Sequence, residues 1–167
     1  DSTQASYARI LTREENGDYT CRAFYSLSHP QEDRNLGEKE PLVAEHYYNW
    51  IMQGGQHEIV RFNDPDLHPE EKSALFFNNA RSICLSPLKG VDKNIGLLIL
   101  GDDKSKEQEA FTPAKQRLID VISDYAASAI QRAILHERLE ETFLETIIAL
   151  ANAVDARDSY TGDHSQR

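Results

Sequence analysis

The sequence predicts an α+β fold: a small antiparallel sheet, flanked by helices and followed by a long C-terminal helix. Short runs rich in aromatic and β-branched residues recur between turn signals, which is typical of strands joined by hairpins. Two segments with helical periodicity interrupt these runs. After the helix start at Phe111-Thr112-Pro113 no strong helix breaker occurs until Gly162, so one helix is expected to cover most of that stretch.

The first two strands are predicted to form a hairpin. We expect them at residues 7–12 (YARILT) and 19–27 (YTCRAFYSL), both rich in aromatic and β-branched residues. The connecting segment REENGD contains Asn16-Gly17, a dipeptide favoured in tight hairpin turns.

A helix and a third strand are expected next. Residues 42–53 (LVAEHYYNWIMQ) follow Glu40-Pro41 and place apolar side chains at helical spacing, and Gly54-Gly55 is a typical C-terminal stop. Residues 57–62 (HEIVRF) alternate as a short strand. Turn residues then lead to a short helix beginning near Pro69.

Two apolar strands complete the predicted sheet, at residues 83–88 (ICLSPL) and 95–100 (IGLLIL). Their nearly continuous apolar character predicts central positions in the sheet. Phe111-Thr112-Pro113 then supplies the N-cap and first turn of the long helix.

The long helix carries two apolar stripes. The first is expected to pack on the sheet and comprises Leu118, Ile122, Tyr125, Ala129 and Ala133. The second recurs in steps of four and three along Leu135, Leu139, Phe143, Ile147, Leu150 and Val154. Because acids and bases alternate beside this second stripe, we expect it to be the seam of a homodimeric coiled coil. The alternative is a helix that folds back on its own domain.

Composition limits the partners. The 18 Lys and Arg against 28 Asp and Glu give a formal net charge of −10, which repels nucleic-acid phosphates and anionic lipid. We therefore expect no nucleic-acid partner and no membrane partner. The polar start DSTQASYAR resembles neither a signal peptide nor a membrane span, so a soluble cytoplasmic protein is expected.

The two cysteines are expected to be buried, reduced thiols. Cys21 and Cys84 lie far apart in sequence and within apolar, strand-like runs. Their spacing does not match a zinc site.

The order of these elements resembles the GAF domain, and residues 95–134 carry the likeness most clearly. They are similar to its closing strand, Gly-Asp turn, Phe-Thr-Pro helix start and Ala-rich terminal helix. Here Gly101 is expected to adopt a backbone conformation that other residues resist, and Thr112 to cap the helix. The resemblance implies a GAF-like sensory domain over residues 1–134, with helices on one face of the sheet and a ligand pocket on the other. GAF domains usually begin with a helix, whereas a strand pattern begins this chain almost at once.

Residues 143–167 (FLETIIALANAVDARDSYTGDHSQR) are similar to the first helix and turn of the HD-GYP family. These bacterial phosphohydrolases open cyclic di-GMP at a two- or three-iron centre. The residues that match the opening pattern are Ala153, Asp155, Ala156, Arg157, Asp158, Tyr160, Thr161, Gly162, His164, Ser165 and Arg167. Asp163 lies where that pattern often has Gly. The resemblance makes His164 a metal ligand in a full-length parent, with the remaining ligands beyond residue 167.

The expected organisation has three parts: a GAF-like domain over 1–134, a coiled-coil signalling helix over 135–154, and a truncated HD-GYP start over 155–167. We therefore expect a regulatory fragment of a cyclic di-GMP phosphodiesterase that senses a small molecule and relays its state through a dimeric helix. Without the remaining ligands the fragment is expected to be no enzyme and to hold no cofactor. Iron or another divalent metal is expected only in the missing domain.

The sensed ligand is expected near the stretch HEIVRFNDPDLHPEE, residues 57–71. Its polar side chains lie in a turn-rich segment over an apolar sheet, the arrangement that a small-molecule site requires. The candidate ligand-binding residues are His57, Arg61, Asn63, Asp64 and His68, with Asp66 nearby. The alternative is an ordinary solvated loop.

Some ligand classes fit less well. Cyclic-nucleotide-binding GAF domains carry an Asn-Lys, Phe, Asp-Glu signature; this chain has Lys93-Asn94 and Phe111, but Lys115-Gln116 where the acids should be. Neither cysteine lies in an evident bilin-attachment context. A histidine as haem ligand stays open, the candidates being His46, His57 and His68.

Two other functions remain open. One GAF branch reduces free methionine sulfoxide with cysteines, which requires an accessible thiol of low pKa and a resolving partner. Cys21 and Cys84 lack a nearby cationic cluster in the sequence. The other alternative is a dimerisation module whose pocket is filled by its own side chains.

Overall fold

The computed structural model describes residues 5–27, 36, 37, 39, 44–103 and 111–164, with side chains described up to Asp155. The chain divides into two compact units, Asp1–Ser128 and Ala129–Arg167. The first contains the sheet, two short helices and the beginning of the long helix; the second contains the rest of that helix.

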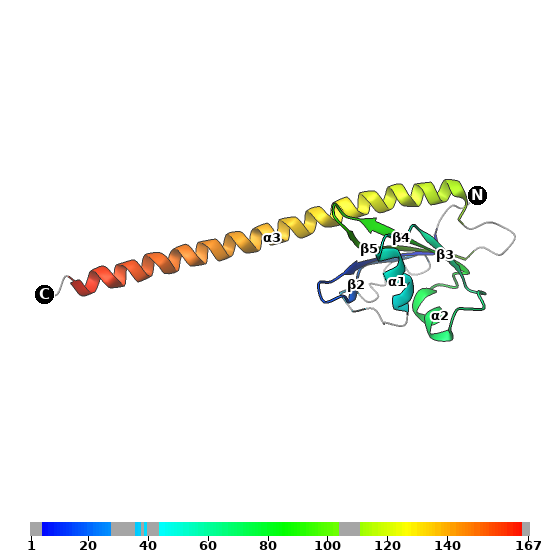
Figure 1. Cartoon of the computed structure of the whole chain (residues 1–167), viewed down its shortest axis with the longest axis horizontal. Coiled ribbons are helices and arrows are strands. Elements are labelled where there is room, and N and C mark those ends of the chain that lie inside the picture. Colours follow the sequence, from blue (N-terminus) through cyan, green and yellow to red (C-terminus); the bar gives the residue numbers. More distant parts are fainter. Residues whose placement is uncertain (1–4, 28–35, 38, 40–43, 104–110, 165–167) are drawn as a thin grey trace. The chain divides into compact units, whose positions relative to one another are not determined.

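The sheet of the first unit has five antiparallel strands in the order β2-β1-β5-β4-β3 (Figure 1). Their bounds are β1 Tyr7–Arg13, β2 Tyr19–Ser26, β3 Glu58–Arg61, β4 Ser82–Lys89 and β5 Asn94–Asp102. The five strands expected from the sequence are confirmed to within a few residues. The inner positions of β4 and β5 are confirmed as well.

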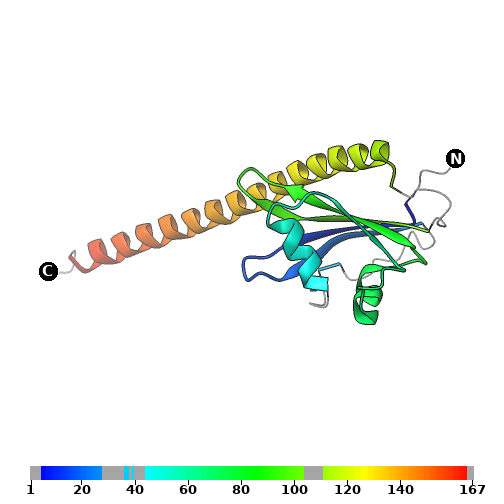
Figure 2. The ribbon, with the colours of Figure 1, turned by 45° about the vertical axis from the view of Figure 1, so that its right-hand side comes forward.

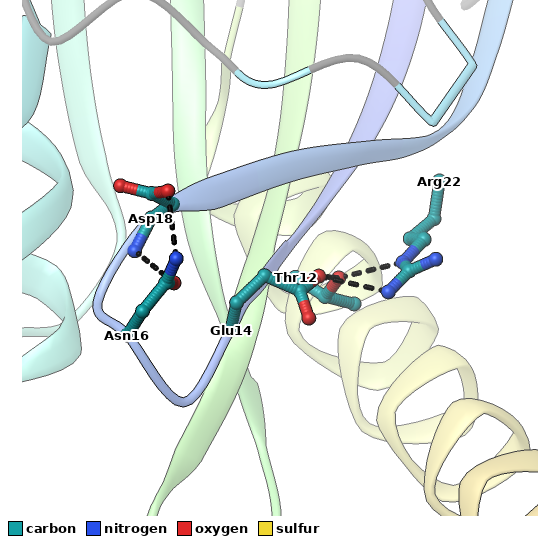
Figure 3. A network of polar contacts seen from close by, with 5 residues as sticks. All are labelled: Thr12, Glu14, Asn16, Asp18 and Arg22. Carbon is teal, nitrogen blue, oxygen red and sulfur yellow. Dashed lines mark hydrogen bonds and ion pairs between the residues drawn. The ribbon is translucent and has the colours of Figure 1, made fainter.

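The hairpin between β1 and β2 turns at the expected Asn-Gly pair. Gly17 has a φ of +93°, a conformation that side chains other than Asn and Asp rarely accept. Asn16 holds the turn by accepting a hydrogen bond from the backbone N–H of Asp18 (3.1 Å) and donating one to its carboxylate (2.9 Å) (Figure 3). Across the two strands, Arg22 donates to Thr12 (2.9 Å) and to Glu14 (2.8 Å).

Both faces of the sheet are covered, which explains the continuous apolar runs in its inner strands. Helices α1 (Glu45–Met52) and α2 (Pro69–Leu75) lie on one face, and the beginning of α3 (Pro113–His164) lies on the other (Figure 2). The strand period of two sends Leu97 and Ile99 toward α1 and α2, and Leu98 toward α3. Largely aromatic and aliphatic residues form the core under α1 and α2, among them Tyr7, Leu11, Tyr19, Tyr48, Ile51, Leu75, Ile83 and Leu85.

Helix α1 ends where the sequence predicts. Its C-cap is Gln53, and Gly54 follows with a φ of +103°, the left-handed conformation that terminates helices. The predicted beginning of this helix falls on residues 40–43, which lie outside the described residues, and the described helix begins at Glu45.

Helix α3 confirms the single long helix expected after Phe111. The hydroxyl of Thr112 accepts a hydrogen bond from the backbone N–H of Lys115 (3.4 Å), so the predicted N-cap is present. In the part of the chain that the structure describes, no helix is both long and apolar enough to cross a membrane.

The prediction of which side of α3 packs on the sheet is wrong by about a quarter turn of the helix. Leu118, Ile122 and Tyr125 are exposed, whereas the buried residues of this segment are Ile119, Ser123 and Ala127. The buried stripe was obscured because it is short and partly polar: the Ser123 hydroxyl donates to that of Ser86 on β4 (2.9 Å). A helix can bury small and hydrogen-bonded residues on a sheet while its larger apolar residues face outward.

The reason given for Gly101 is also wrong. This residue pairs with Tyr7 in the sheet, and its φ lies outside the left-handed region. A Cβ at Gly101 would lie 2.0 Å from Cε1 of Tyr7. Glycine is therefore required here because the buried Tyr7 ring occupies the space of a side chain.

Candidate functional site

A cleft of about 380 Å³ opens in the first unit, between the segment after β3 and the segment between α2 and β4. Its size falls in the range of small-molecule sites. The lining combines two phenylalanine rings, two carboxamides and a guanidinium, from Phe62, Asn63, Phe76, Asn79, Ala80 and Arg81.

The two rings of the cleft are held by α2. Phe76 is the C-cap of α2, and its ring meets that of Phe62 edge to face, with centroids 5.4 Å apart. The Lys72 ammonium lies 5.2 Å from the centre of the Phe62 ring, within cation–π range. Pro69 begins α2, and a capping box fixes its orientation.

Two consecutive asparagines bring Arg81 to the cleft. Asn78 and Asn79 have φ angles of 51° and 58°, the left-handed conformation that asparagine tolerates best among residues with a side chain. Asn78 also donates to the hydroxyl of Ser26 (2.6 Å), which ties this turn to β2. The Asn-Asn pair was the sequence signal for this turn, and the prediction did not use it.

The structure spreads the five predicted ligand-binding residues over several environments. Asn63 lines the cleft. Arg61 is exposed at the end of β3, and Asp64 accepts a hydrogen bond from the backbone of Asp66 (3.1 Å) within the loop. His68 is the N-cap of α2, and its backbone N–H donates to Glu71 (2.8 Å).

His57 contacts α3 with both ring nitrogens. Its Nδ1 lies 3.1 Å from a carboxylate oxygen of Asp120, and its Nε2 lies 3.2 Å from the amide oxygen of Gln116. The Gln116 amide nitrogen donates to the Phe111 carbonyl (2.9 Å), which orients the amide oxygen toward the ring. Both partner atoms of His57 are hydrogen-bond acceptors. His57 therefore joins the edge of the sheet to α3.

A buried arginine was missed by the sequence prediction. Arg9 is 3% exposed, and strand alternation puts it on the same sheet face as Tyr7 and Leu11. Its Nη1 donates to the carbonyl of Ala74 in α2 (3.1 Å), and its guanidinium lies 4.7 Å from the centre of the Phe77 ring. A polar residue inside the alternating run YARILT was the available signal.

The two cysteines are buried in the sheet. Burial raises the pKa of the Cys84 thiol to about 12, and the Asp120 carboxylate adds to the rise. At neutral pH this thiol is therefore almost entirely protonated, which opposes nucleophilic or redox catalysis.

The described residues contain no group of three or more His, Cys, Asp or Glu side chains placed to hold a metal ion. The side chain of His164, the metal ligand implied by the HD-GYP resemblance, lies outside the described part. The residues that the structure describes thus do not form the iron centre of that family.

The residues of the predicted dimer seam are exposed to solvent in the second unit. Its six large apolar side chains are between 46% and 68% exposed along α3: Leu135, Leu139, Phe143, Ile147, Leu150 and Val154. Each is accessible to a partner.

Comparison with family models gives no match to this chain, and comparison with curated proteins gives none either. Solved structures of GAF domains do match. The GAF domain of a two-component sensor histidine kinase from Bacillus halodurans is 18% identical, with a TM-score of 0.62 over 80% of this chain and 86% of that one.

Two further solved GAF domains also match the structure of this chain. The GAF domain of PixJ from Thermosynechococcus elongatus, solved in its blue-light absorbing form, is 15% identical with a TM-score of 0.61, covering 83% of this chain and 81% of that one. The GAF-B domain of DevS from Mycobacterium smegmatis is 13% identical with a TM-score of 0.57, covering 81% and 86%. Together these likenesses show that the chain has the GAF fold.

Proposed function

We propose that this chain is a GAF sensory domain that relays the binding of a small molecule, through a dimeric helix, to an HD-GYP phosphohydrolase domain. The observation that carries the proposal is the exposed apolar seam of α3 from Leu135 to Val154. Large apolar side chains repeated on one helical stripe are costly to leave in water, so such a stripe is typical of helices that associate.

A second copy of the helix is the partner that best fits this seam. The residues recur in steps of 4, 4, 4, 3 and 4, a spacing close to that of a straight or slightly right-handed helical seam. Acidic and basic residues occur beside the seam, as at the flanks of such dimers; Arg138, Glu140 and Glu141 are examples.

The sensory role rests on the cleft beside α2. Arg81 and Asn63 offer charged and neutral hydrogen-bond donors next to the Phe62 and Phe76 rings. Apolar walls with a few convergent polar groups are the usual composition of a small-molecule site. One of the GAF structures described above comes from a sensor histidine kinase, which agrees with a sensory role.

The proposed phosphohydrolase activity of the parent protein rests on the resemblance of residues 155–167 to the opening turn of the HD-GYP family. In that proposal His164 is one metal ligand, and the other ligands come from a following domain of the parent protein. Iron or another divalent metal in that domain would activate the water that opens cyclic di-GMP. The coding sequence after codon 167 tests this part: it should contain the His-Asp pair and the GYP segment, and a different following domain would contradict it.

The proposed relay is a change in how α3 packs. The helix turns that carry Ile119 and Ser123 contact the sheet, and His57 contacts the same helix through Asp120. A ligand that binds one arrangement of the sheet more tightly than another shifts the population of helix positions. A small rotation or shift of the paired helices then reaches the output domain.

Sedimentation equilibrium tests the dimer seam. The double variant Phe143→Asp/Leu150→Asp puts four charges into the seam of the dimer and should leave a monomer. The matched control is Thr142→Asp/Ala149→Asp, with the same spacing and added charge at exposed positions about 100° around α3 from the substituted seam residues. Equal effects of the two variants, or a monomeric wild type, would remove the dimer from the proposal.

Thermal unfolding with a panel of small metabolites tests the sensory role. A ligand of the native state raises the midpoint by mass action, and the Arg81→Met variant should lose that rise. If no compound raises the midpoint, the ligand-free dimerisation module becomes the better proposal. The methionine sulfoxide reductase alternative is disfavoured by the burial and high pKa of Cys84.

A further inference from the structure

Three polar side chains line the cleft beside α2. They are Asn63, Asn79 and Arg81, and all three are exposed. Among the described residues, no hydrogen bond or ion pair engages the carboxamides of the two asparagines or the guanidinium of Arg81. These groups can therefore bind a ligand without first breaking a contact with another described residue.

Strand pairing brings Arg81 next to Phe62. The backbone N–H of Phe62 donates to the carbonyl of Arg81 (2.9 Å), so the two residues lie opposite each other just beyond the paired ends of β3 and β4. Val60 and Ile83, two residues away on the two strands, are paired and belong to the core under α1 and α2. The strand period of two therefore puts the Phe62 ring and the Arg81 guanidinium on that same face of the sheet.

The apolar walls of the cleft are aromatic. Phe62 is 43% exposed, and the ring of the partly buried Phe76 meets it edge to face, with centroids 5.4 Å apart. A flat π-system gains from edge and offset contacts with such rings, in addition to the burial of apolar area. A saturated group gains only from the burial. A planar aromatic ring is therefore the apolar part of a ligand that suits these walls best.

The charges around the cleft favour a ligand with a single negative charge. Arg81 is the only charged residue among the described residues that line the cleft, so an anionic group gains an ion pair there. Asp64 and Asp66 follow Asn63 closely in the sequence, and the chain carries a net charge of −10. A di- or triphosphate would meet this negative field with several charges, whereas a carboxylate meets it with one. The volume of about 380 Å³ is near the lower limit of small-molecule sites, which suits a ligand of about one ring.

We propose that the cleft binds a small aromatic monocarboxylate; this inference rests on the proposed function, in which the same cleft is the sensory site. The guanidinium of Arg81 is a planar fork of N–H donors that matches the two oxygens of a carboxylate. The carboxamides of Asn63 and Asn79 donate further hydrogen bonds to polar groups of the ligand. The ligand ring lies against the phenyl rings of Phe62 and Phe76.

A ligand in this position joins two segments of the first unit. Phe62 and Asn63 come directly after β3, whereas Phe76 caps the end of α2 and Asn79 lies in the left-handed turn that leads to β4. Because the ligand contacts both segments only when they lie side by side, its binding shifts the population of α2 toward that position. Helix α2 is thus the element whose packing responds to the bound carboxylate.

Titration of the chain with benzoate, followed through the backbone amide signals in nuclear magnetic resonance, tests this inference. The signals of Phe62, Asn63, Asn79 and Arg81 should shift together and saturate. Three further probes separate the requirements: benzamide has the shape without the charge, cyclohexanecarboxylate has the charge without the aromatic ring, and phenyl phosphate carries more than one charge on the same ring. Each of the three should bind about tenfold more weakly than benzoate.

Two arginine variants provide the matched comparison. Arg81→Met removes the guanidinium from the cleft and should raise the dissociation constant of benzoate about tenfold. The control Arg61→Met makes the same substitution at the exposed last residue of β3, on the opposite face of the strand from Phe62. It should change the constant by less than about threefold. Phe62→Leu should reduce the preference for benzoate over cyclohexanecarboxylate, and circular dichroism checks that all three variants fold.

The outcomes separate this inference from the proposed function. If benzoate shifts no cleft signal while another metabolite raises the unfolding midpoint and Arg81→Met abolishes that rise, the aromatic carboxylate is refuted and the sensory role stands. If no probe and no metabolite binds, both are refuted. If any of the other three probes binds as tightly as benzoate, or if the two arginine variants have equal effects, the inference is refuted. Selective binding of benzoate that Arg81→Met weakens and Arg61→Met does not weaken supports it.

Discussion

Replacement of Ile119 by alanine tests which side of α3 packs on the sheet. Ile119 is 6% exposed, and the substitution removes three carbon atoms from the space between helix and sheet. At about 0.8 kcal/mol for each buried methylene, the lost transfer free energy is about 2.4 kcal/mol, and the remaining cavity adds to it. We expect the free energy of unfolding to fall by about 3 kcal/mol.

Ile122→Ala is the matched control, because it makes the same chemical change three residues further along. Ile122 is 46% exposed in the first unit, and alanine is the better helix former. In a monomer its loss should cost about 1 kcal/mol or less. This is the residue that helical periodicity alone placed against the sheet.

The assay is urea unfolding followed by circular dichroism, in the Phe143→Asp/Leu150→Asp background and at a concentration where that background is monomeric. With a denaturant slope of about 1.5 kcal/mol/M, Ile119→Ala should lower the midpoint by about 2 M, and Ile122→Ala by well under 1 M. Equal shifts, or a larger shift for Ile122→Ala, would refute the packing of α3 through Ile119, Ser123 and Ala127.

Three further predictions follow from single sites. His57→Ala removes two hydrogen bonds to α3, and because Asp120 is partly exposed the loss should be about 1 kcal/mol in thermal unfolding; an unchanged midpoint would contradict the link. Burial raises the pKa of Cys84 from its ordinary value of 9.0 to about 12, so the stability that the protonated thiol contributes is complete below pH 9 and is lost, by about 4 kcal/mol, as pH rises toward 12. The Cys84→Ala variant should flatten that decline of stability with pH. Thiol titration of the native protein at pH 8 should show no fast reaction. Gly101→Ala places a Cβ against the buried Tyr7 ring and should cost about 3 kcal/mol or prevent folding, whereas an unchanged midpoint in thermal unfolding would contradict that packing.

The elements of the fold could be predicted because their signals are local. The Asn16-Gly17 turn, the stop at Gly54 and the cap at Thr112 each depend on residues within one turn of the chain. Apolar runs with a β-rich composition located β4 and β5 without knowledge of their partners.

The face of α3 that meets the sheet could not be predicted in the same way. The helix has large apolar residues on more than one side, and hydrophobicity alone favours the stripe with Leu118 over the one with Ser123. The buried stripe depends on Ser86, which lies 37 residues away in sequence and supplies the hydrogen bond.

The candidate site was only partly predictable for a similar reason. Asn63 was expected in a ligand site and lines the cleft, but Phe76 and Arg81 reach it through the left-handed turn at Asn78-Asn79. His57 was expected with them, yet its partners on α3 are 59 and 63 residues away. Contacts of that separation are set by the assembled fold.

Sedimentation equilibrium of the unaltered chain tests the central claim, that α3 joins two copies. The chain has a mass of 19.0 kDa, and the exposed stripes of α3 predict twice that value at micromolar concentration. A mass of 19.0 kDa that persists up to millimolar concentration would contradict the dimer, and the relay through it.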